Sequence, residues 1–313
     1  MESRKLGRQG LEVSAIGYGA MGTAAGYGPS DDTESIAAIR TAHELGVTLF
    51  DTAEMYGWGT GEQLLGTALA PIRDDVVIAT KFGLTPEGGM NSRPDHIREV
   101  VENSLRNLNV DTIDVLYQHR SDPDVPIEDV VGVMQGFVQA GKVKYLGLSE
   151  ADGETIRRAH AVHPISVLQS EYSIFAHDAE PVLPVIEELG IGLVAYSPLA
   201  RGFLAAPPKP RTEYAAYDFR QYLGWWAPAN FDPNAALSNE LREFAAEKGT
   251  TLSTLALAWL LAKRDYIVPI PGSRNPARVA DNIAASDLHL STTDLARIDA
   301  IAPNGAVGSR NYG

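Results

Sequence analysis

The chain has 313 residues, 44% of them hydrophobic, and a formal net charge of −14 at pH 7. A chain of this length can bury a large core as one α/β barrel or as two smaller domains, and no cut point favours two. The acidic balance argues against nucleic acid or an anionic membrane as the main partner, because either requires a basic face. Without cysteine, the chain can form no disulfide, thiolate metal site or cysteine nucleophile.

Targeting signals are also missing from the sequence pattern. The first residues lead into no apolar segment typical of a signal peptide, and the longest apolar stretch, residues 255–262, is too short to span a bilayer. We therefore expect a cytoplasmic protein that acts on small molecules.

Strand and helix patterns alternate along the chain. A hairpin is predicted around residues 8–10, followed by a strand at 13–19 and a helix that starts at Asp31, where Glu34 completes the pattern of a capping box. Seven further strands, each followed by a helical pattern, are predicted at 47–51, 76–81, 113–119, 143–149, 165–169, 192–196 and 266–271. A long irregular segment, 201–234, precedes a helical region at 235–262.

Eight β/α units with continuously apolar strands favour a closed parallel barrel. The prediction is one (α/β)8 TIM barrel over residues 1–313, with an N-terminal hairpin and a long loop after the seventh strand. In such barrels the chemistry lies at the C-terminal ends of the strands. Here those ends carry Asp51, Lys81, His119, Ser149, Gln169 and Tyr196.

Three of these strand ends form a candidate catalytic group. Lys81 ends an apolar strand, where burial is costly without a carboxylate, and Asp51 is the obvious partner. His119 alone is typical of a core histidine, but on a rim shared with Asp51, Lys81 and Tyr56 a functional role is favoured. Tyr56 follows Asp51 by five residues, in a predicted loop.

Residues 17–22 match the G-x-G-x-x-G pattern of dinucleotide-binding folds. That motif requires a helix at its third glycine, whereas residues 23–30 are predicted as a loop. Asp51 also lies about 29 residues beyond Gly22, where the motif expects an acid after about 20. We interpret these glycines as a tight loop at the barrel rim, and a Rossmann dehydrogenase is the alternative fold.

Several longer motifs resemble one known family. They are residues 46–57, Lys81, and residues 117–120, 147–151, 169–173, 196–202 and 269–274. With them the chain resembles the aldo-keto reductases over nearly its whole length, and is most similar to bacterial and plant reductases of broad carbonyl substrates. The resemblance implies an (α/β)8 barrel, NADPH bound in an extended pose, and a catalytic tetrad of Asp51, Tyr56, Lys81 and His119.

The chemistry of these four side chains is consistent with carbonyl reduction. A carbonyl that accepts hydride develops negative charge on oxygen and requires a proton. Tyr56 can donate it if the positive charge of Lys81, held by Asp51, favours phenolate, and neutral His119 can orient the oxygen. Nothing in this scheme requires a metal, and we interpret residues 121–124 as a turn and N-cap.

Further positions take their roles from the resemblance alone. It implies that Ser149 and Gln169 bind the nicotinamide carboxamide and that Tyr196 stacks on the ring. Gly22 also belongs to the implied cofactor site. Ser197, Leu199 and Arg201 match the pyrophosphate segment. The adenosine and 2′-phosphate end matches Ser273, Arg274, Arg278, Asp281 and Asn282. The chain departs from the family at Glu150, commonly Asn, and at Gly272, commonly Lys.

The substrate is an open question at this stage. Trp58 and aromatic residues of the 201–234 segment suggest an apolar carbonyl substrate, although an oligomer interface would use the same residues. These aromatic residues are Tyr214, Tyr217, Phe219, Tyr222, Trp225 and Trp226. Two alternative functions stay open. One is a non-catalytic NADPH-binding subunit that senses redox state, and the other is a metal-dependent barrel hydrolase or isomerase using Asp51 and His119. The oligomeric state is unknown.

Overall fold

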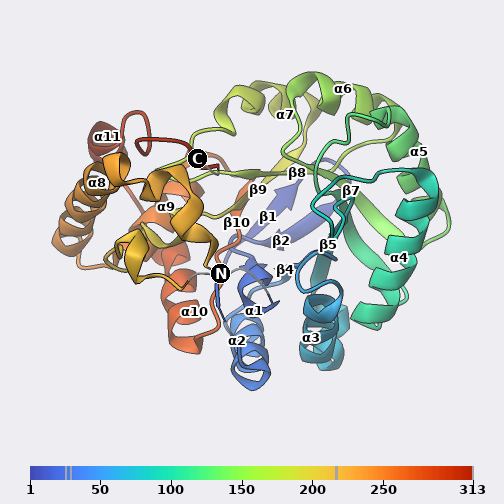
Figure 1. The fold of residues 1–313 in the computed structure, drawn as a ribbon, viewed down its shortest axis with the longest axis horizontal. Coiled ribbons are helices and arrows are strands. Elements are labelled where there is room, and N and C mark those ends of the chain that lie inside the picture. Colours follow the sequence, from blue (N-terminus) through green and yellow to red (C-terminus); the bar gives the residue numbers. More distant parts are fainter. Residues whose placement is uncertain (25–26, 29, 216–217, 312–313) are drawn as a thin grey trace.

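The structure is a computed structural model of the chain, and it describes residues 1–24, 27–28, 30–215 and 218–311. A central parallel sheet is surrounded by helices (Figure 1). From one edge to the other, its eight described strands are β10 (Ile267–Pro269), β9 (Gly192–Tyr196), β8 (Val167–Glu171), β7 (Val143–Ser149), β6 (Ile113–Gln118), β5 (Val77–Phe82), β4 (Leu49–Asp51) and β3 (Tyr18–Gly19). All neighbouring strands are parallel.

Helices follow the strands along the chain. The described α-helices are α1 (Met21–Ala24), α2 (Asp32–Glu44), α3 (Thr60–Leu69), α4 (Pro94–Leu108), α5 (Ile127–Gln139), α6 (Gly153–Val162), α7 (Leu183–Leu189), α8 (Pro228–Glu247), α9 (Leu252–Lys263), α10 (Pro276–Ile283) and α11 (Thr292–Ile301). Short 3₁₀ helices are η1 (Ala70–Asp75), η2 (Glu180–Val182), η3 (Ala200–Gly202), η4 (Arg211–Glu213), η5 (Phe219–Tyr222), η6 (Gly224–Trp226) and η7 (Ala284–Asp287). As predicted, Asp31 caps α2 by accepting a hydrogen bond from the backbone of Glu34.

Backbone hydrogen bonds join the two edges of the sheet. The Gly17 amide donates to the Pro269 carbonyl at 2.9 Å, and the Gly19 amide donates to the Pro271 carbonyl at 3.3 Å. A Cβ on Gly19 would lie 2.7 Å from the Ile270 carbonyl oxygen, closer than packed atoms allow. The predicted (α/β)8 barrel is thus confirmed, but Gly17 and Gly19 form its seam at strand β3 and not the rim loop predicted for this glycine run.

An antiparallel hairpin of β1 (Ser3–Leu6) and β2 (Leu11–Ser14) fills the N-terminal end of the barrel. Its apolar side chains Leu6, Leu11 and Val13 pack against inward-facing side chains of the barrel strands: Leu49, Val115, Val167, Val194 and Val268. The single strand predicted at 13–19 is wrong. The chain leaves the hairpin after Ala15, whose amide bonds to Glu2, and enters the barrel at Gly17.

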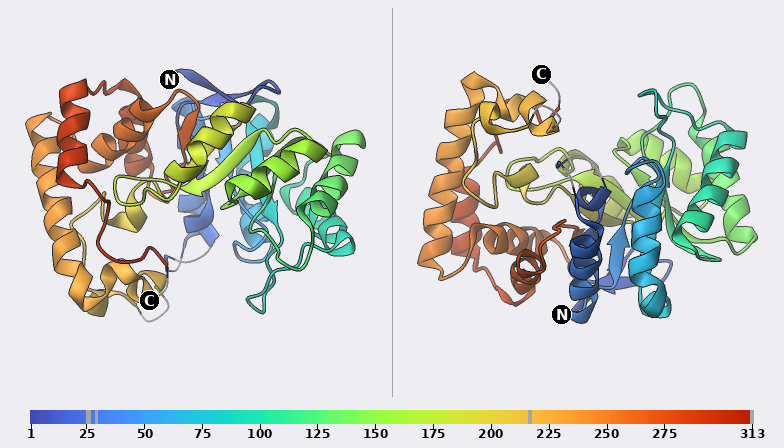
Figure 2. Two further views of the ribbon diagram at one scale, coloured as in Figure 1. Left: turned by 90° about the horizontal axis from the view of Figure 1, so that it is seen from above. Right: turned by 60° about the horizontal axis from the view of Figure 1, so that its bottom comes forward.

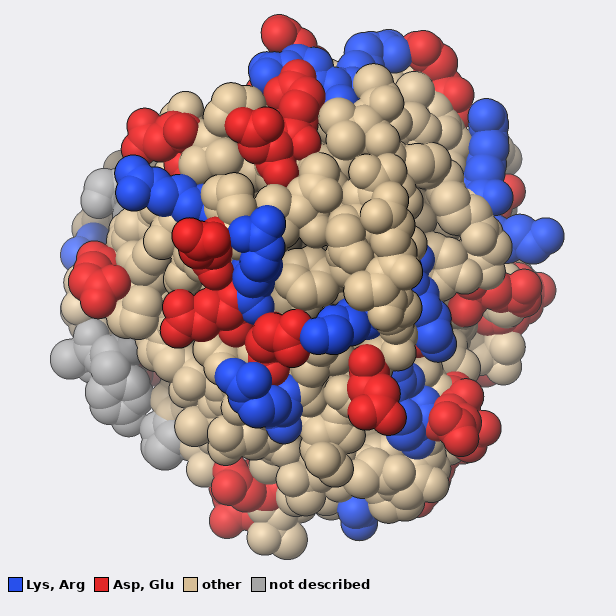
Figure 3. Space-filling model, turned by 90° about the vertical axis from the view of Figure 1, so that its right-hand side faces the viewer, with Lys and Arg blue, Asp and Glu red and all other residues tan. Residues whose placement is uncertain are grey.

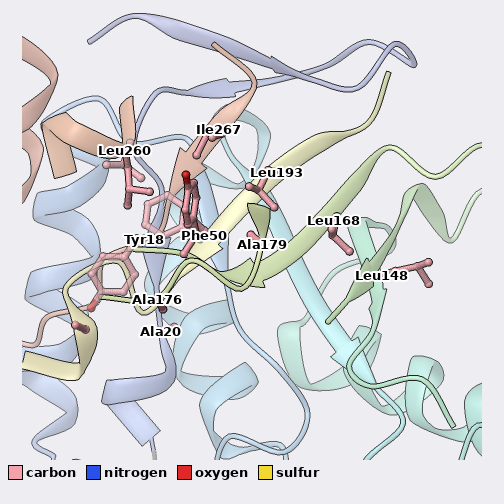
Figure 4. Close-up of a cluster of buried hydrophobic side chains, with 14 of the residues drawn as sticks. Tyr18, Ala20, Phe50, Leu148, Leu168, Ala176, Ala179, Leu193, Leu260 and Ile267 are labelled. Atoms are coloured by element: carbon pink, nitrogen blue, oxygen red, sulfur yellow. The ribbon is translucent and has the colours of Figure 1, made fainter. Parts of the chain in front are cut away.

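The outer side of the sheet carries the main core. Figure 4 shows apolar side chains from successive strands, among them Phe50, Leu148, Leu168, Leu193 and Ile267, which pack toward the helices. Strand side chains alternate between the two faces, so the residues next to these point into the barrel. This alternation determines which residues at the ends of the strands can contact one another inside the barrel.

Three predictions of helices and loops need correction. The helical region predicted at 235–262 is two helices, because Gly249 takes a left-handed conformation and Thr251 caps α9. Helix α8 begins earlier than expected, at Pro228, where a proline fits the first helical turn. Residues 23 and 24, predicted as loop, belong to the one-turn helix α1.

The helical exterior is mixed in charge. On the face seen in Figure 3, Lys and Arg are interspersed with Asp and Glu. Ion pairs join neighbouring helices, such as Arg158 with Glu128 and Arg157 with Glu188. In the part of the chain that the structure describes, no helix is both long and apolar enough to cross a membrane.

The seam geometry generates a stability prediction. We expect Gly19→Ala to lower the free energy of unfolding by about 1–3 kcal/mol, because the new methyl group overlaps the Ile270 carbonyl. Gly136→Ala is the matched control: it lies in α5 with nothing near its Cβ position, and we expect a gain of about 0.5–1 kcal/mol. Urea unfolding measures both, and equal stabilities of the two variants would contradict the seam.

Candidate active site

A buried ion pair lies inside the barrel at the C-terminal ends of the strands. The Lys81 ammonium contacts Asp51 Oδ1 at 2.5 Å and donates to the Thr52 carbonyl at 2.7 Å. The Gln169 amide donates to the second oxygen, Asp51 Oδ2, at 2.7 Å. Strands β4, β5 and β8 each contribute one inward-facing side chain. The pairing expected from the two strand ends is therefore present, with Gln169 as a further partner.

Tyr56 and His119 lie beside this pair. The Lys81 ammonium is 5.3 Å from the centre of the Tyr56 ring. The rings of Tyr56 and His119 are nearly perpendicular, with centroids 6.1 Å apart. The structure therefore brings together the four residues proposed as a tetrad, although their catalytic roles stay a prediction.

Burial shifts the pKa of each group in this cluster. It raises the pKa of Tyr56, with the charge of Asp51 adding to the shift and Arg120 opposing it. It lowers the pKa of His119 well below its ordinary value, helped by the charges of Lys81 and Arg120. Burial also raises the pKa of Asp51 and lowers that of Lys81, while their mutual contact opposes both shifts. At neutral pH the site thus holds a protonated phenol and a neutral imidazole.

Arg120 is a site residue that sequence reasoning did not assign. Its guanidinium donates to the carbonyl of His119 at 2.6 Å and to the Ser149 hydroxyl at 3.1 Å. Its charge also opposes the rise in the pKa of Tyr56, a role that was predicted for Lys81. Its place directly after His119 in the motif at 117–120 was the available signal.

A pocket of about 700 Å³ opens next to this cluster. Most residues predicted for the cofactor and two of the tetrad line it: Gly22, Asp51, Tyr56, Gln169, Tyr196, Ser197, Leu199, Arg201, Ser273, Arg274, Arg278, Asp281 and Asn282. Lys81, His119 and Ser149 are buried and each neighbours a lining residue. The pocket connects the catalytic cluster with the N-terminal part of α10.

Charged side chains of the pocket have partners that the sequence did not reveal. Arg201 contacts the buried carboxylate of Glu171 at 2.6 Å, and Arg274 donates to the backbone carbonyls of Tyr27 and Gly28. Asn275 caps α10 by accepting from the amides of Ala277 and Arg278. Two amides at the N-terminal end of α10 therefore already have a hydrogen-bond partner within the chain. The Arg278 side chain is exposed.

Helix α8 adds an arginine to the pocket that sequence reasoning missed. Arg242 lines the pocket, donates to the Ala205 carbonyl at 3.1 Å, and pairs with no carboxylate among the residues that the structure describes. Burial lowers its pKa. Helix α9 and strand β10 separate its helix from α10, so no local motif links Arg242 to the other pocket residues.

The tryptophans proposed for the substrate occupy two different environments. Trp58 is 44% exposed and adopts a left-handed backbone conformation with φ of 51°. Trp225 and Trp226 are each 1% exposed, and Trp226 packs against Phe203 with ring centroids 4.3 Å apart. Substrate contact by these two therefore stays a prediction that their burial does not support. Tyr217, proposed with them, lies outside the described residues.

The segment 121–124 forms a turn but does not cap α5. Asp122 accepts hydrogen bonds from the amides of Ser92 and Asp124, so it ties the turn to the loop before α4. The residue at the N-cap of α5 is Pro126, so the N-cap interpretation is wrong. Among the described residues, no cluster of three or more His, Asp or Glu side chains is arranged to hold a metal ion.

The buried pair generates the second prediction. Asp51→Asn removes the charge opposite Lys81 and should cost about 3–5 kcal/mol, because it leaves a buried ammonium without a counter-charge. The double variant Asp51→Asn/Lys81→Met should recover much of this loss. Glu247→Gln, which breaks the exposed pair with Arg297, is the control and should leave the unfolding midpoint nearly unchanged. A double variant no more stable than Asp51→Asn would contradict the pairing.

The chain is similar to several solved structures over nearly its whole length. The chain is 27% identical to the glycerol dehydrogenase of Gluconobacter oxydans, with a TM-score of 0.87 over 96% of this chain and 94% of that one. It is 29% identical to an aldo-keto reductase from Bacillus halodurans in its holo form, with a TM-score of 0.81 over 96% of each chain. An aldo/keto reductase from Klebsiella pneumoniae in complex with NADP and acetate is 26% identical, with a TM-score of 0.77 over 99% of each chain. The profile of the aldo/keto reductase family matches residues 15–303, and the chain belongs to that family.

Proposed function

We propose that the protein reduces aldehydes and ketones to alcohols by hydride transfer from NADPH. The observation that carries the proposal is the buried Lys81–Asp51 pair, with Tyr56 and His119 beside it, next to a pocket that Asp51 and Tyr56 help to line. Membership of the family supports nicotinamide-dependent carbonyl reduction in general. We further propose that residues 1–313 form one domain and that the protein is cytoplasmic.

The proposed roles follow from the protonation states of the site. Bound NADPH would supply a hydride to the carbonyl carbon. Tyr56 donates its phenolic proton to the carbonyl oxygen, and its raised pKa keeps that proton available at neutral pH. Neutral His119 donates a hydrogen bond to the same oxygen and orients it. Lys81 and Arg120 place positive charge near the phenolate that remains.

The pocket residues fit an extended dinucleotide. Gln169 and Tyr196 offer an amide and a flat ring for nicotinamide. Arg201, Arg274 and Arg278 line the same pocket, and we assign the last two to the 2′-phosphate, which would meet their positive charge. The Klebsiella pneumoniae relative, solved with NADP, supports this assignment. Exposed Trp58, close to Tyr56 in the chain, favours a carbonyl substrate with an apolar part.

A non-catalytic NADPH-binding subunit is the second candidate. It would use the same pocket and would bind NADPH tightly with negligible turnover on any carbonyl. A panel of aldehydes, ketones and quinones, followed by loss of NADPH absorbance, separates the two functions. Turnover on any member of the panel favours the reductase.

The third prediction concerns the proton donor. Tyr56→Phe should lower kcat for an activated aldehyde by about 10² or more with NADPH affinity nearly unchanged, because the phenol acts in the transition state. Tyr145→Phe, near the hairpin end of the barrel, is the control and should keep parental kcat. If Tyr56→Phe retains more than about a tenth of kcat, Tyr56 is not the general acid.

The fourth prediction concerns cofactor choice. We expect NADPH to be preferred over NADH, and Arg278→Ala to reduce that preference about ten- to hundredfold, because a charge-assisted contact to the 2′-phosphate is lost. Arg158→Ala, in an exposed pair with Glu128, is the control. The measurement is kcat/KM for both cofactors. Equal losses with NADPH and NADH, or a parental preference for NADH, would show that Arg278 does not bind a 2′-phosphate.

A further inference from the structure

A chain of alternating charges runs along the barrel mouth, from the predicted pyrophosphate segment to the C-terminal residues. Arg201 contacts Glu171 Oε2 at 2.6 Å, and Arg310 contacts the same oxygen at 3.0 Å. Arg310 continues to Glu150 Oε2 at 2.5 Å and to Asp178 at 3.2 Å. The Glu171 side chain is fully buried and that of Arg310 is 15% exposed, so water screens the network weakly.

Arg310 belongs to the segment that follows α11. Figure 2 (left) shows this segment returning from α11 toward the 3₁₀ helices of the loop after β9. Backbone contacts hold it on both sides: the Ala306 amide donates to Phe175, the Val307 amide donates to Asn234, and the Gly224 amide donates to Asn311. The guanidinium of Arg310 is thus delivered to the mouth by an anchored segment.

The guanidinium also contacts a residue of the cofactor pocket. Arg310 Nη1 donates to the Tyr196 hydroxyl at 3.1 Å. Tyr196 lines the pocket, while Arg310, Glu150 and Glu171 lie outside its described lining. Arg310 therefore holds the phenol end of Tyr196 from behind the pocket wall and leaves the pocket itself open.

The same network accounts for the acid at position 150. Glu150 adopts a left-handed conformation with φ of 55° and accepts from the Glu171 amide at 2.8 Å. Its second oxygen pairs with Arg310. Burial opposes its ionisation, but the hydrogen bonds from Arg310 and the Glu171 amide prevail and lower the pKa of Glu150. An amide at this position would not supply the charge that Arg310 requires.

We propose that Arg310 is a positioning residue of the cofactor site, which fixes Tyr196 through its hydroxyl and so makes the nicotinamide end of the pocket depend on the C-terminal segment. The proposal rests on the proposed function, since it takes Tyr196 as the aromatic that stacks on nicotinamide. Glu150 and Glu171 set the position of Arg310, and Arg310 sets that of the ring.

The test compares two ligands that differ only at the nicotinamide end. NADPH carries the ring, whereas 2′-phospho-ADP-ribose has the same pyrophosphate and adenosine parts without it. We expect Arg310→Met to raise Kd for NADPH about five- to tenfold, with little change for 2′-phospho-ADP-ribose. Arg297→Met, on α11, is the matched control. It breaks the exposed pair with Glu247 and should change the Kd of neither ligand.

A double-variant cycle identifies the hydroxyl as the link. Tyr196→Phe keeps the ring and removes the atom that Arg310 holds, so Arg310→Met should have less than half of its effect in the Tyr196→Phe background. If Arg310→Met does not fold, Arg310→Lys serves in its place, because it keeps a charge but cannot contact Glu150, Glu171 and Tyr196 together.

Two results would overturn the inference. One is an equal loss of affinity for both ligands, which would show general loosening of the pocket; the other is unchanged affinity for both. Failure of the parent protein to bind NADPH is a separate outcome, because it removes the proposed function on which the inference rests.

Discussion

The buried contact between Lys81 and Asp51 is the interaction on which the arrangement of the barrel interior depends. Burial of an isolated ammonium favours loss of its charge and destabilises the fold, and the carboxylate of Asp51, with the Thr52 carbonyl, opposes both effects. The partners come from different strands, and Gln169 arrives from a third. They meet only if the strands hold their register around a closed sheet. Correct assembly of the barrel and assembly of the reactive cluster are therefore the same event.

Closure of the sheet is a constraint of backbone space. Gly19 of β3 lies so close to the Ile270 carbonyl, directly after β10, that no side chain fits at position 19. The glycine pattern that resembles a dinucleotide-binding motif serves this contact. Gly22, at the end of the pattern, does line the pocket, so one short sequence contributes to both the seam and the site.

The sequence was most informative where structure follows from local spacing. The C-terminal ends of the predicted strands placed Asp51, Lys81 and Gln169 on one rim of the barrel, and the motifs identified much of the pocket lining. It was least informative where distant segments meet in space. Arg310 contacts Glu150, from which it is separated by 160 positions in the sequence. Arg242 lines the pocket from the helical region predicted at 235–262, to which no site residue was assigned. Trp225 and Trp226 looked like mouth residues because aromatic composition does not distinguish a buried loop core from an exposed rim.

The hairpin at the N-terminal end has a kinetic consequence. Leu6, Leu11 and Val13 seal that end of the barrel with apolar side chains, so nothing enters or leaves there. Under the proposed function, both reactants would reach Tyr56 from the pocket side. The larger one would lie along the pocket wall that includes Tyr196 and Arg278, so we expect it to bind before the smaller one covers its reactive end and to leave after it. Closure of the N-terminal end of the barrel thus determines the expected order of binding and release, although the hairpin lies far from the reactive cluster.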